Sequence, residues 1–242
     1  MEPDPELTHD RLTKDVWLWQ RKKGHRFSVD DVATAFVAVL RAPAARKILD
    51  LGSGIGSVLL HLAWSLPDAE LWGIEAQPIS FALLTRNLAE SGFAERVHLH
   101  HGDLREPPPL GLFDLITGTP PYFPVGTALP AADEQRAYAR IEHRGGVEAY
   151  LETAARLLAP AGLVVLCGAS DADARVLASA RALDLHLQER VGIVARAPKP
   201  PLFTIWVLGR TPTIPRATTL TIRDTTGERT PEAATLRAFS GL

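Results

Sequence analysis

Cysteine, methionine and net charge are all scarce in this 242-residue chain, which has one cysteine, one methionine and a formal net charge of −2. With Cys167 alone, no disulfide can form within the chain, so the sequence does not point to an oxidising compartment. No apolar run approaches the roughly 20 residues that a membrane-spanning helix needs. The first six residues are acidic and contain proline, unlike the basic and then apolar order of a signal peptide. We therefore expect a cytoplasmic protein that does not contact a membrane.

The near-neutral charge argues against a strongly basic, non-specific nucleic-acid binder, although a local basic patch remains possible in such a chain. Residues 21–26 read Arg-Lys-Lys-Gly-His-Arg and are a candidate for this patch; the alternative is a solvated charge run. Apolar residues make up 46% of the chain and charged residues 22%, as in ordinary globular proteins. The length suits one large α/β domain and is short for two.

Strand and helix patterns alternate through most of the chain after residue 43. The predicted strands are 47–51, 70–74, 97–101, 113–117, 162–167, 185–194 and 202–208. The predicted helices are 32–40, 57–65, 78–91, 147–158 and 171–183. Because parallel neighbours need a crossover, which is usually a helix, this alternation predicts an α/β fold with a mainly parallel, seven-stranded sheet. Only residues 196–201 join the last two strands, which predicts an antiparallel hairpin at the C-terminal end.

The chain is expected to have three parts. Residues 1–25 lack a clear hydrophobic period and are expected to be an extended or loosely packed N-terminal extension. Residues 26–210 form the α/β domain. Residues 211–242 are rich in threonine, proline and arginine and are expected to be a tail that packs on the same domain. Within the tail, residues 219–222 are a candidate edge strand and residues 231–239 a candidate short helix.

A glycine-rich loop follows the first predicted strand of the sheet and precedes a predicted helix. Gly52, Gly54 and Gly56 permit a tight turn and a close approach of a ligand to the backbone, because glycine has no Cβ. A dinucleotide site is one alternative, but its Gly-x-Gly-x-x-Gly pattern needs a glycine where this chain has Ser57. Asp50, just before the loop, would repel a pyrophosphate, whereas its charge suits the cationic amino group of a methionine moiety. The sign of this charge favours S-adenosyl-L-methionine.

Acidic residues also follow the next two predicted strands. Glu75 ends the second strand, where a carboxylate can accept hydrogen bonds from both ribose hydroxyls. Asp103 follows the third, where it can accept a hydrogen bond from an adenine amino group; the neighbouring Ala76 and Leu104 are further candidate contacts. Each carboxylate alone could instead cap a helix or belong to a turn. Because parallel strands end at one edge of a sheet, the carboxylates and the loop together predict one S-adenosyl-L-methionine site.

A double proline and two aromatic residues come directly after the fourth strand, in the order Thr119-Pro120-Pro121-Tyr122-Phe123. The segment resembles the Asn/Asp/Ser-Pro-Pro-Tyr/Phe motif of methyltransferases that act on adenine N6, cytosine N4 or a glutamine side-chain amide. The nitrogen of such an acceptor is a poor nucleophile because its lone pair is delocalised. A side-chain acceptor at the first position and the next backbone carbonyl can bind the amino hydrogens and direct the lone pair toward the donor methyl group.

Proline has no N–H to compete for these carbonyls, and an aromatic ring can stack on a base. Thr119, Pro120, Pro121 and Tyr122 are therefore the candidate catalytic residues, and Thr119 is also expected to contact the donor. Threonine stands where the motif most often has asparagine, and its hydroxyl is a shorter acceptor that can also donate. The alternative is a structural loop in a methyltransferase that uses another acceptor.

Taken together, these motifs resemble the bacterial tRNA(Val) adenine-N6 methyltransferase family over residues 18–225. The resemblance includes residues 24–30, which look like the family's segment that closes over the donor and imply donor contacts by Phe27 and Asp30. It implies a Rossmann-like class I methyltransferase fold, with S-adenosyl-L-homocysteine as the product and no metal. Residues 134–140 and 199–201 are similar to the family's Arg-x-x-Ala-Arg stretch and Lys-Pro-Pro turn. The implied substrate contacts are Phe123, Arg136, Arg140 and Lys199.

Two further side-chain clusters have competing interpretations. Arg136, Arg140 and Arg144 are four residues apart, so a helix would place all three on one face. That face would contact phosphates, or would be a surface paired with neighbouring acidic residues. The histidines at positions 98, 100 and 101 are expected to be structural, because only two share a strand face and no cysteine cluster accompanies them.

The sequence thus predicts adenine-N6 methylation of tRNA or another structured RNA by a monomer or weak dimer. One alternative is an N-methyltransferase that acts on a protein glutamine or a small molecule. A second is a non-catalytic subunit that binds the donor or RNA.

Overall fold

The strands of the computed structural model, which describes residues 6–127 and 133–242, form one eight-stranded and one two-stranded sheet. Residues 1–5 of the expected N-terminal extension and residues 128–132 lie outside this range. The order in the large sheet is β10-β8-β9-β7-β6-β3-β4-β5. Its strands are β3 (Lys47–Leu51), β4 (Glu70–Glu75), β5 (Val97–His101), β6 (Phe113–Gly118), β7 (Leu158–Ala169), β8 (His186–Val194), β9 (Phe203–Gly209) and β10 (Arg216–Thr221).

The pairing of these strands confirms the expected α/β fold. β7, β6, β3, β4 and β5 are parallel neighbours, and β9 lies antiparallel between β7 and β8, so the C-terminal hairpin is present. The sheet has eight strands rather than seven, because β10 pairs in parallel with the free edge of β8. The candidate edge strand at residues 219–222 is thus present as β10, which begins three residues earlier, at Arg216; most of its residues are exposed, so its start has no hydrophobic period.

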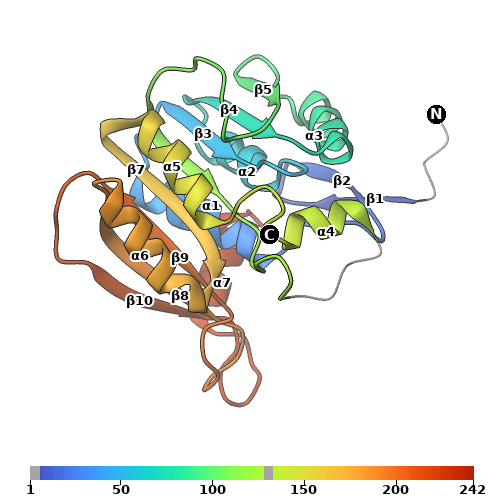
Figure 1. Ribbon diagram of the computed structural model, residues 1–242. Helices are drawn as coiled ribbons and strands as arrows, with labels where there is room; N and C mark the ends of the chain where they lie inside the picture. Colours follow the sequence, from blue (N-terminus) through green and yellow to red (C-terminus); the bar gives the residue numbers. More distant parts are fainter. Residues whose placement is uncertain (1–5, 128–132) are drawn as a thin grey trace.

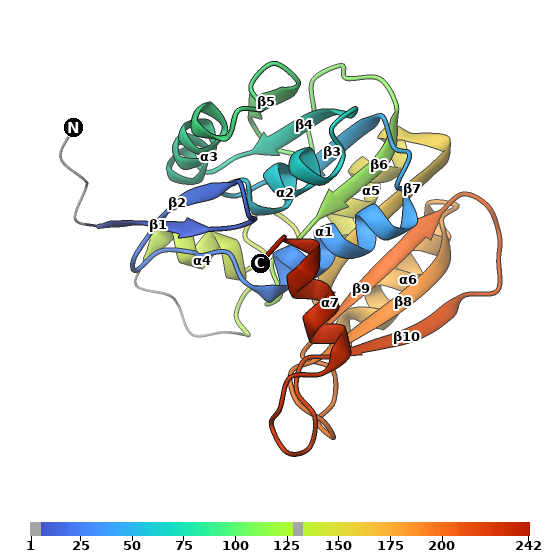
Figure 2. The same ribbon diagram turned by 180° about the vertical axis from the view of Figure 1, so that it is seen from behind.

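Helices cover both faces of the large sheet (Figures 1 and 2), and each face buries its own hydrophobic cluster. α5 and α6 pack on one face, whereas α1, α2, α3 and α7 pack on the other. The helices are α1 (Val29–Arg41), α2 (Ser57–Ser65), α3 (Pro78–Ser91), α4 (Glu134–Arg140), α5 (Val147–Leu157), α6 (Asp173–Ala182) and α7 (Pro231–Phe239). In the part of the chain that is described, no helix combines the length and apolar character needed to cross a membrane.

Within the expected N-terminal extension, residues 7–11 and 17–21 form extended strands, one of the two states expected, and they pack on the domain rather than loosely. β1 (Leu7–Arg11) and β2 (Trp17–Arg21) form an antiparallel hairpin, and Leu18 is fully buried. The backbone N–H of Trp19 donates to Asn87 Oδ1 of α3 at 2.7 Å. The sequence hides this packing because the second inward residue of β2 is a polar one, Gln20, and the outward ones are tryptophans.

The C-terminal helix α7 ends beside α1 and α2 (Figure 2). The Phe239 ring stacks on His61 at 4.4 Å between centroids and meets Phe36 edge-on at 5.3 Å. His61 Nε2 lies 2.9 Å from Ser240 Oγ, and burial lowers the pKa of His61 to about 4. A neutral histidine therefore fixes the end of the chain to the face of the sheet that α1 covers.

Candidate functional site

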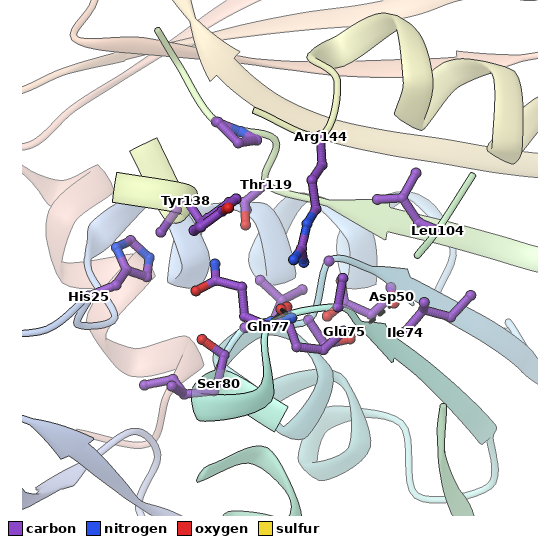
Figure 3. Close-up of a pocket in the computed structure, with 18 of the residues that line it drawn as sticks. His25, Asp50, Ile74, Glu75, Gln77, Ser80, Leu104, Thr119, Tyr138 and Arg144 are labelled. Atoms are coloured by element: carbon purple, nitrogen blue, oxygen red, sulfur yellow. Dashed lines mark hydrogen bonds between the residues drawn. The ribbon is translucent and has the colours of Figure 1, made fainter. Parts of the chain in front are cut away.

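A cavity opens at the carboxyl ends of β3 and β4 (Figure 3). We call it the donor cavity. It brings together most of the residues expected to contact the donor. Those on its wall are Asp50, Gly52, Gly54, Glu75, Ala76, Asp103, Leu104 and Thr119.

The glycine-rich loop forms the floor of the donor cavity. Gly52, Gly54 and Gly56 all have positive φ angles, of 63°, 56° and 96°. A Cβ on Gly54 would point into open space, which leaves room for a ligand against the backbone. A Cβ on Gly56 would lie 2.7 Å from Leu84 Cδ1, and Gly56 is absent from the cavity wall. Gly54 is therefore the glycine open to a ligand, whereas Gly56 serves the packing of α2 on α3.

Asp50 and Glu75 on the cavity wall are buried, and neither forms an ion pair with another described residue. Thr117 Oγ1 donates to Asp50 Oδ1 at 2.7 Å, and burial raises the pKa of Asp50 to about 6. Glu75 accepts from the backbone N–H groups of Gly54 at 2.8 Å and Gln77 at 2.6 Å. Burial raises the pKa of Glu75 to about 7. A ligand with positive charge or several hydroxyl donors would stabilise both ionised groups, which fits S-adenosyl-L-methionine.

Asp103 differs from these two carboxylates because a neighbouring cation pairs with it. Arg105 donates to both of its oxygens, at 2.9 and 2.7 Å, and holds the pKa of Asp103 below its usual range. Asp103 still lines the donor cavity.

Besides Gly56, two expected donor contacts lie away from the donor cavity. The Phe27 ring packs against the hydrophobic core, and its backbone N–H donates to Gln20 Oε1 at 3.1 Å. Asp30 faces a second cavity, where it accepts a 3.1 Å hydrogen bond from the Tyr122 hydroxyl. The adjacent residue, Asp31, is the one that reaches the donor cavity. Burial, together with the nearby Asp30 charge, raises the pKa of Asp31 to about 8.

Sequence reasoning missed Asp31, and a local signal for it exists. Ser28 caps α1, and Asp31 three residues later accepts from the Ser28 backbone N–H at 2.9 Å. This is a capping box, in which the acidic member is fixed at the helix N-terminus. The Ser-x-x-Asp spacing could have indicated that Asp31, rather than Asp30, would be held in place.

The second cavity meets the donor cavity at Thr119, and we call it the acceptor cavity. Both are lined by His25, Asp31, Thr119 and Ala139. The wall of the acceptor cavity is rich in cations: Lys22, Lys23, Arg26, Arg136 and Arg140. Residues 22–26 of the candidate basic patch therefore line the same space as the expected substrate arginines, whereas Arg21 pairs with Asp133.

The two aromatic residues of the double-proline loop have different surroundings. The Tyr122 hydroxyl donates to Asp30 and lies 2.9 Å from Cys167 Sγ, and burial raises the Tyr122 pKa. Phe123 is 36% exposed, and the Arg140 guanidinium lies 5.3 Å from its ring centroid. Tyr122 is thus anchored beneath the loop, and Phe123 is the more open ring of the pair.

Known proteins share both the sequence pattern and the fold. The model of the methyltransferase small domain family matches residues 25–137. A tRNA1(Val) (adenine(37)-N6)-methyltransferase from Tolumonas auensis is 31% identical over 193 residues, which cover 78% of this chain and 78% of that protein. The chain belongs to the methyltransferase small domain family. It is an S-adenosyl-L-methionine-dependent enzyme, as the resemblance in the sequence implied.

Other relatives differ in their named acceptors. A release factor glutamine methyltransferase from Gloeobacter violaceus is 30% identical over 143 residues, which cover 56% of this chain and 49% of that protein. Among solved structures, a predicted O-methyltransferase from Agrobacterium tumefaciens superposes with a TM-score of 0.62 at 19% identity, covering 87% of this chain and 96% of that one. The structure of Pyrococcus horikoshii TYW2 in complex with MeSAdo superposes with a TM-score of 0.60 at 15% identity. The superposition covers 87% of this chain and 74% of that one. These two structures confirm the Rossmann-like methyltransferase fold.

The arginines of this methyltransferase do not share one helix face, so that expectation is wrong. α4 ends at Arg140 because Ile141 is extended and pairs with Phe123. Arg136 and Arg140 line the acceptor cavity, whereas Arg144 reaches into the donor cavity toward Glu75 (Figure 3). Its Nη1 is buried and has no hydrogen-bond partner among the described residues.

The acidic neighbours of these arginines pair with other residues. Asp133 receives a 2.7 Å hydrogen bond from Arg21 of β2, and Glu142 pairs with Arg175 of α6 at 2.9 Å. These ion pairs attach both ends of the α4 segment to the body of the methyltransferase.

Lys199 is the one expected substrate residue that the structure does not bring to either cavity. It is exposed in the turn between β8 and β9. His98 pairs with Glu70 at 3.0 Å on the strand surface. Within the described residues, no group of three or more histidine, cysteine or acidic side chains is arranged to hold a metal ion.

Proposed function

We propose that this methyltransferase modifies adenine N6 in tRNA or another structured RNA. The observation that carries the proposal is the junction of the two cavities at Thr119. The donor cavity is lined mainly by carboxylates, with Arg144 beside them, whereas in the acceptor cavity the five lysines and arginines outnumber Asp30 and Asp31. A phosphate-bearing acceptor is attracted to the second cavity and a cationic donor to the first.

The residues of the donor cavity would hold S-adenosyl-L-methionine by complementary charge and hydrogen bonding. Asp50 would accept a hydrogen bond from the amino group of the donor, and Glu75 would accept hydrogen bonds from its ribose hydroxyls. Because Gly54 has no Cβ, the donor could lie directly against the backbone there. The donor supplies the reactive methyl group. The chain's own task is to orient the acceptor nitrogen.

Thr119 and the double proline would carry out that orientation. The Thr119 hydroxyl and the backbone carbonyl of the next residue, Pro120, would accept hydrogen bonds from the two hydrogens of an exocyclic amine. These bonds would direct the lone pair of the amine nitrogen toward the donor. Phe123, beside Arg140, offers an open ring on which a flipped base can stack. Arg136 and Arg140 would bind the flanking phosphates.

A methylation assay with labelled S-adenosyl-L-methionine and bulk tRNA tests this proposal. After digestion to nucleosides, label is expected in N6-methyladenosine. The matched variant is Thr119→Val, which keeps the side-chain shape and removes the hydrogen-bond acceptor. It should lose about tenfold in turnover and keep its donor affinity. Labelled methyl groups in other nucleosides, or none in RNA, would refute the assignment.

A protein glutamine is the second candidate acceptor. It is supported by the similarity to a release factor glutamine methyltransferase and by the planar amide that the same loop could polarise. Incubation with a purified bacterial release factor, followed by nuclease treatment, distinguishes the two acceptors. Label that survives the nuclease and is removed by protease would favour this candidate.

A further inference from the structure

Five side chains on the N-terminal hairpin and α3 form a continuous row of three aromatic rings with an arginine at each end. Arg86 lies 3.8 Å from the ring centroid of Trp19, which stacks on His9 at 4.2 Å with an interplanar angle of 7°. His9 contacts Trp17 at 5.5 Å, and Arg11 lies 5.8 Å from the Trp17 centroid. We call this row Arg86–Trp19–His9–Trp17–Arg11 the aromatic ladder.

The aromatic ladder occupies the outer face of the hairpin. His9 pairs with Trp19 and Arg11 with Trp17 across β1 and β2, and directly paired residues point to the same side of a sheet. The opposite face carries the buried Leu18. Trp17 is 45% exposed, and His9 and Arg11 are exposed as well. A large ring and two basic side chains are therefore presented to solvent.

The hairpin holds the ladder in a fixed position relative to the donor cavity. Asn87 of α3 accepts from the Trp19 backbone N–H at 2.7 Å and donates to the Trp19 carbonyl at 3.1 Å. The same Asn87 amide donates to the carbonyl of Ile55 in the glycine-rich loop at 2.9 Å. Glu90 accepts hydrogen bonds from Trp19 Nε1 at 2.8 Å and from Arg86 at 3.3 Å, so two members of the aromatic ladder stabilise its negative charge.

The ladder is also continuous with the acceptor cavity. β2 ends at Arg21, and the next residues, Lys22 and Lys23, line that cavity. A strand advances about 3.3 Å per residue, so Trp17 lies roughly 17 Å along the chain from Lys22. Figure 1 shows the hairpin beside α4, which contributes Arg136 and Arg140 to the same cavity.

We propose that the aromatic ladder binds unpaired nucleotides of the RNA substrate at a distance from the methylated base. The proposal rests on the function proposed above. Rings that stack on any base, flanked by arginines that meet phosphates, are the features of a single-stranded RNA surface. Trp17 would stack on a base, and Arg11 and Arg86 would contact the backbone on either side.

The test compares Trp17→Ala with two matched variants in the full-length protein. Trp17→Phe keeps a stacking ring, and Leu177→Ala removes a side chain of α6 that is 40% exposed and outside both cavities. For each protein, initial rates are measured against the concentration of bulk tRNA, and tRNA affinity is measured by filter binding. Trp17→Ala should raise KM and Kd about fivefold or more, with kcat unchanged. Trp17→Phe should recover most of the loss, and Leu177→Ala should match the wild type.

The outcomes separate this proposal from the proposed function. If the wild type methylates tRNA and Trp17→Ala has an unchanged KM and Kd, the ladder proposal alone is overturned. If the wild type neither binds nor methylates RNA, both are overturned. A thermal unfolding curve and donor affinity equal to those of the wild type should accompany the Trp17→Ala effect. A KM effect seen only with a release factor as acceptor would mean a protein surface and would contradict the proposal.

Discussion

Replacing Asp50 by asparagine should have opposite effects on stability and on donor binding. Asp50 is buried at the end of β3, and burial raises its pKa from 3.8 to about 6. Between these pH values the folded protein holds more protons at this position than the unfolded chain does. The free energy of unfolding therefore falls as the pH rises through this window. Above about pH 6, the loss in the free energy of unfolding caused by the buried charge levels off at about 3 kcal/mol.

Asp50→Asn removes this charge and keeps the side-chain shape, and Thr117 can still donate to the amide oxygen. At pH 8 the free energy of unfolding of the variant without donor should exceed that of the wild type by up to about 3 kcal/mol. At pH 4 the difference should nearly vanish. Affinity for S-adenosyl-L-methionine and S-adenosyl-L-homocysteine should fall about tenfold or more, because a hydrogen bond to a charged group contributes about 1.5–3 kcal/mol.

Denaturant unfolding at several pH values and isothermal titration calorimetry measure these two effects. Methylthioadenosine is a matched control ligand, because it keeps the adenosine and thioether and lacks the amino group that Asp50 is expected to bind. Its affinity should be the same for the wild type and the variant. An equal loss for all three ligands would refute the role assigned to Asp50. A stability difference that does not grow between pH 4 and pH 8 would refute the buried-charge argument.

Three further variants probe the loop and the two cavities. Thr119→Asn provides a longer acceptor and should raise turnover on RNA adenine about tenfold with KM unchanged, as measured by nucleoside mass spectrometry; lower turnover would contradict the role of this position. Arg144→Met removes a cation from the wall of the donor cavity and should favour the cationic S-adenosyl-L-methionine over S-adenosyl-L-homocysteine about fivefold in calorimetry, whereas an unchanged ratio would contradict this role. Gly54→Ala should abolish donor binding because its Cβ would occupy the open space beside the backbone, and its positive φ should cost about 1–2 kcal/mol of stability. Gly56→Ala should destabilise more strongly, because its Cβ meets Leu84; the reverse order in thermal unfolding would contradict the packing account.

The central sheet could be predicted from the sequence because its strands and helices have clear periods and short connections. β3 shows why: Ile48 and Leu49 enter the hydrophobic clusters on opposite faces, which is the alternation of a strand covered on both sides. The same logic placed Asp50, Glu75 and Asp103 at one edge, because parallel strands end together. The donor cavity was therefore largely predictable.

The remaining features depend on contacts between distant segments. The fixed position of the N-terminal hairpin depends on Asn87, 68 residues from Trp19 in the chain. The end of α4 depends on the pairing of Ile141 with Phe123, which turns Arg144 into the donor cavity and away from Arg140. Residue spacing within α4 carries no information about that pairing. The position of Lys199 in an exposed turn is likewise set by how β8 and β9 join.

The central claim is that buried carboxylates around an open glycine loop select a cationic sulfonium donor over a diphosphate. Parallel calorimetric titrations of the purified protein with S-adenosyl-L-methionine and with NAD test it most directly. We predict saturable binding of S-adenosyl-L-methionine and no measurable heat with NAD. Clear binding of NAD together with no heat from either S-adenosyl-L-methionine or S-adenosyl-L-homocysteine would contradict it.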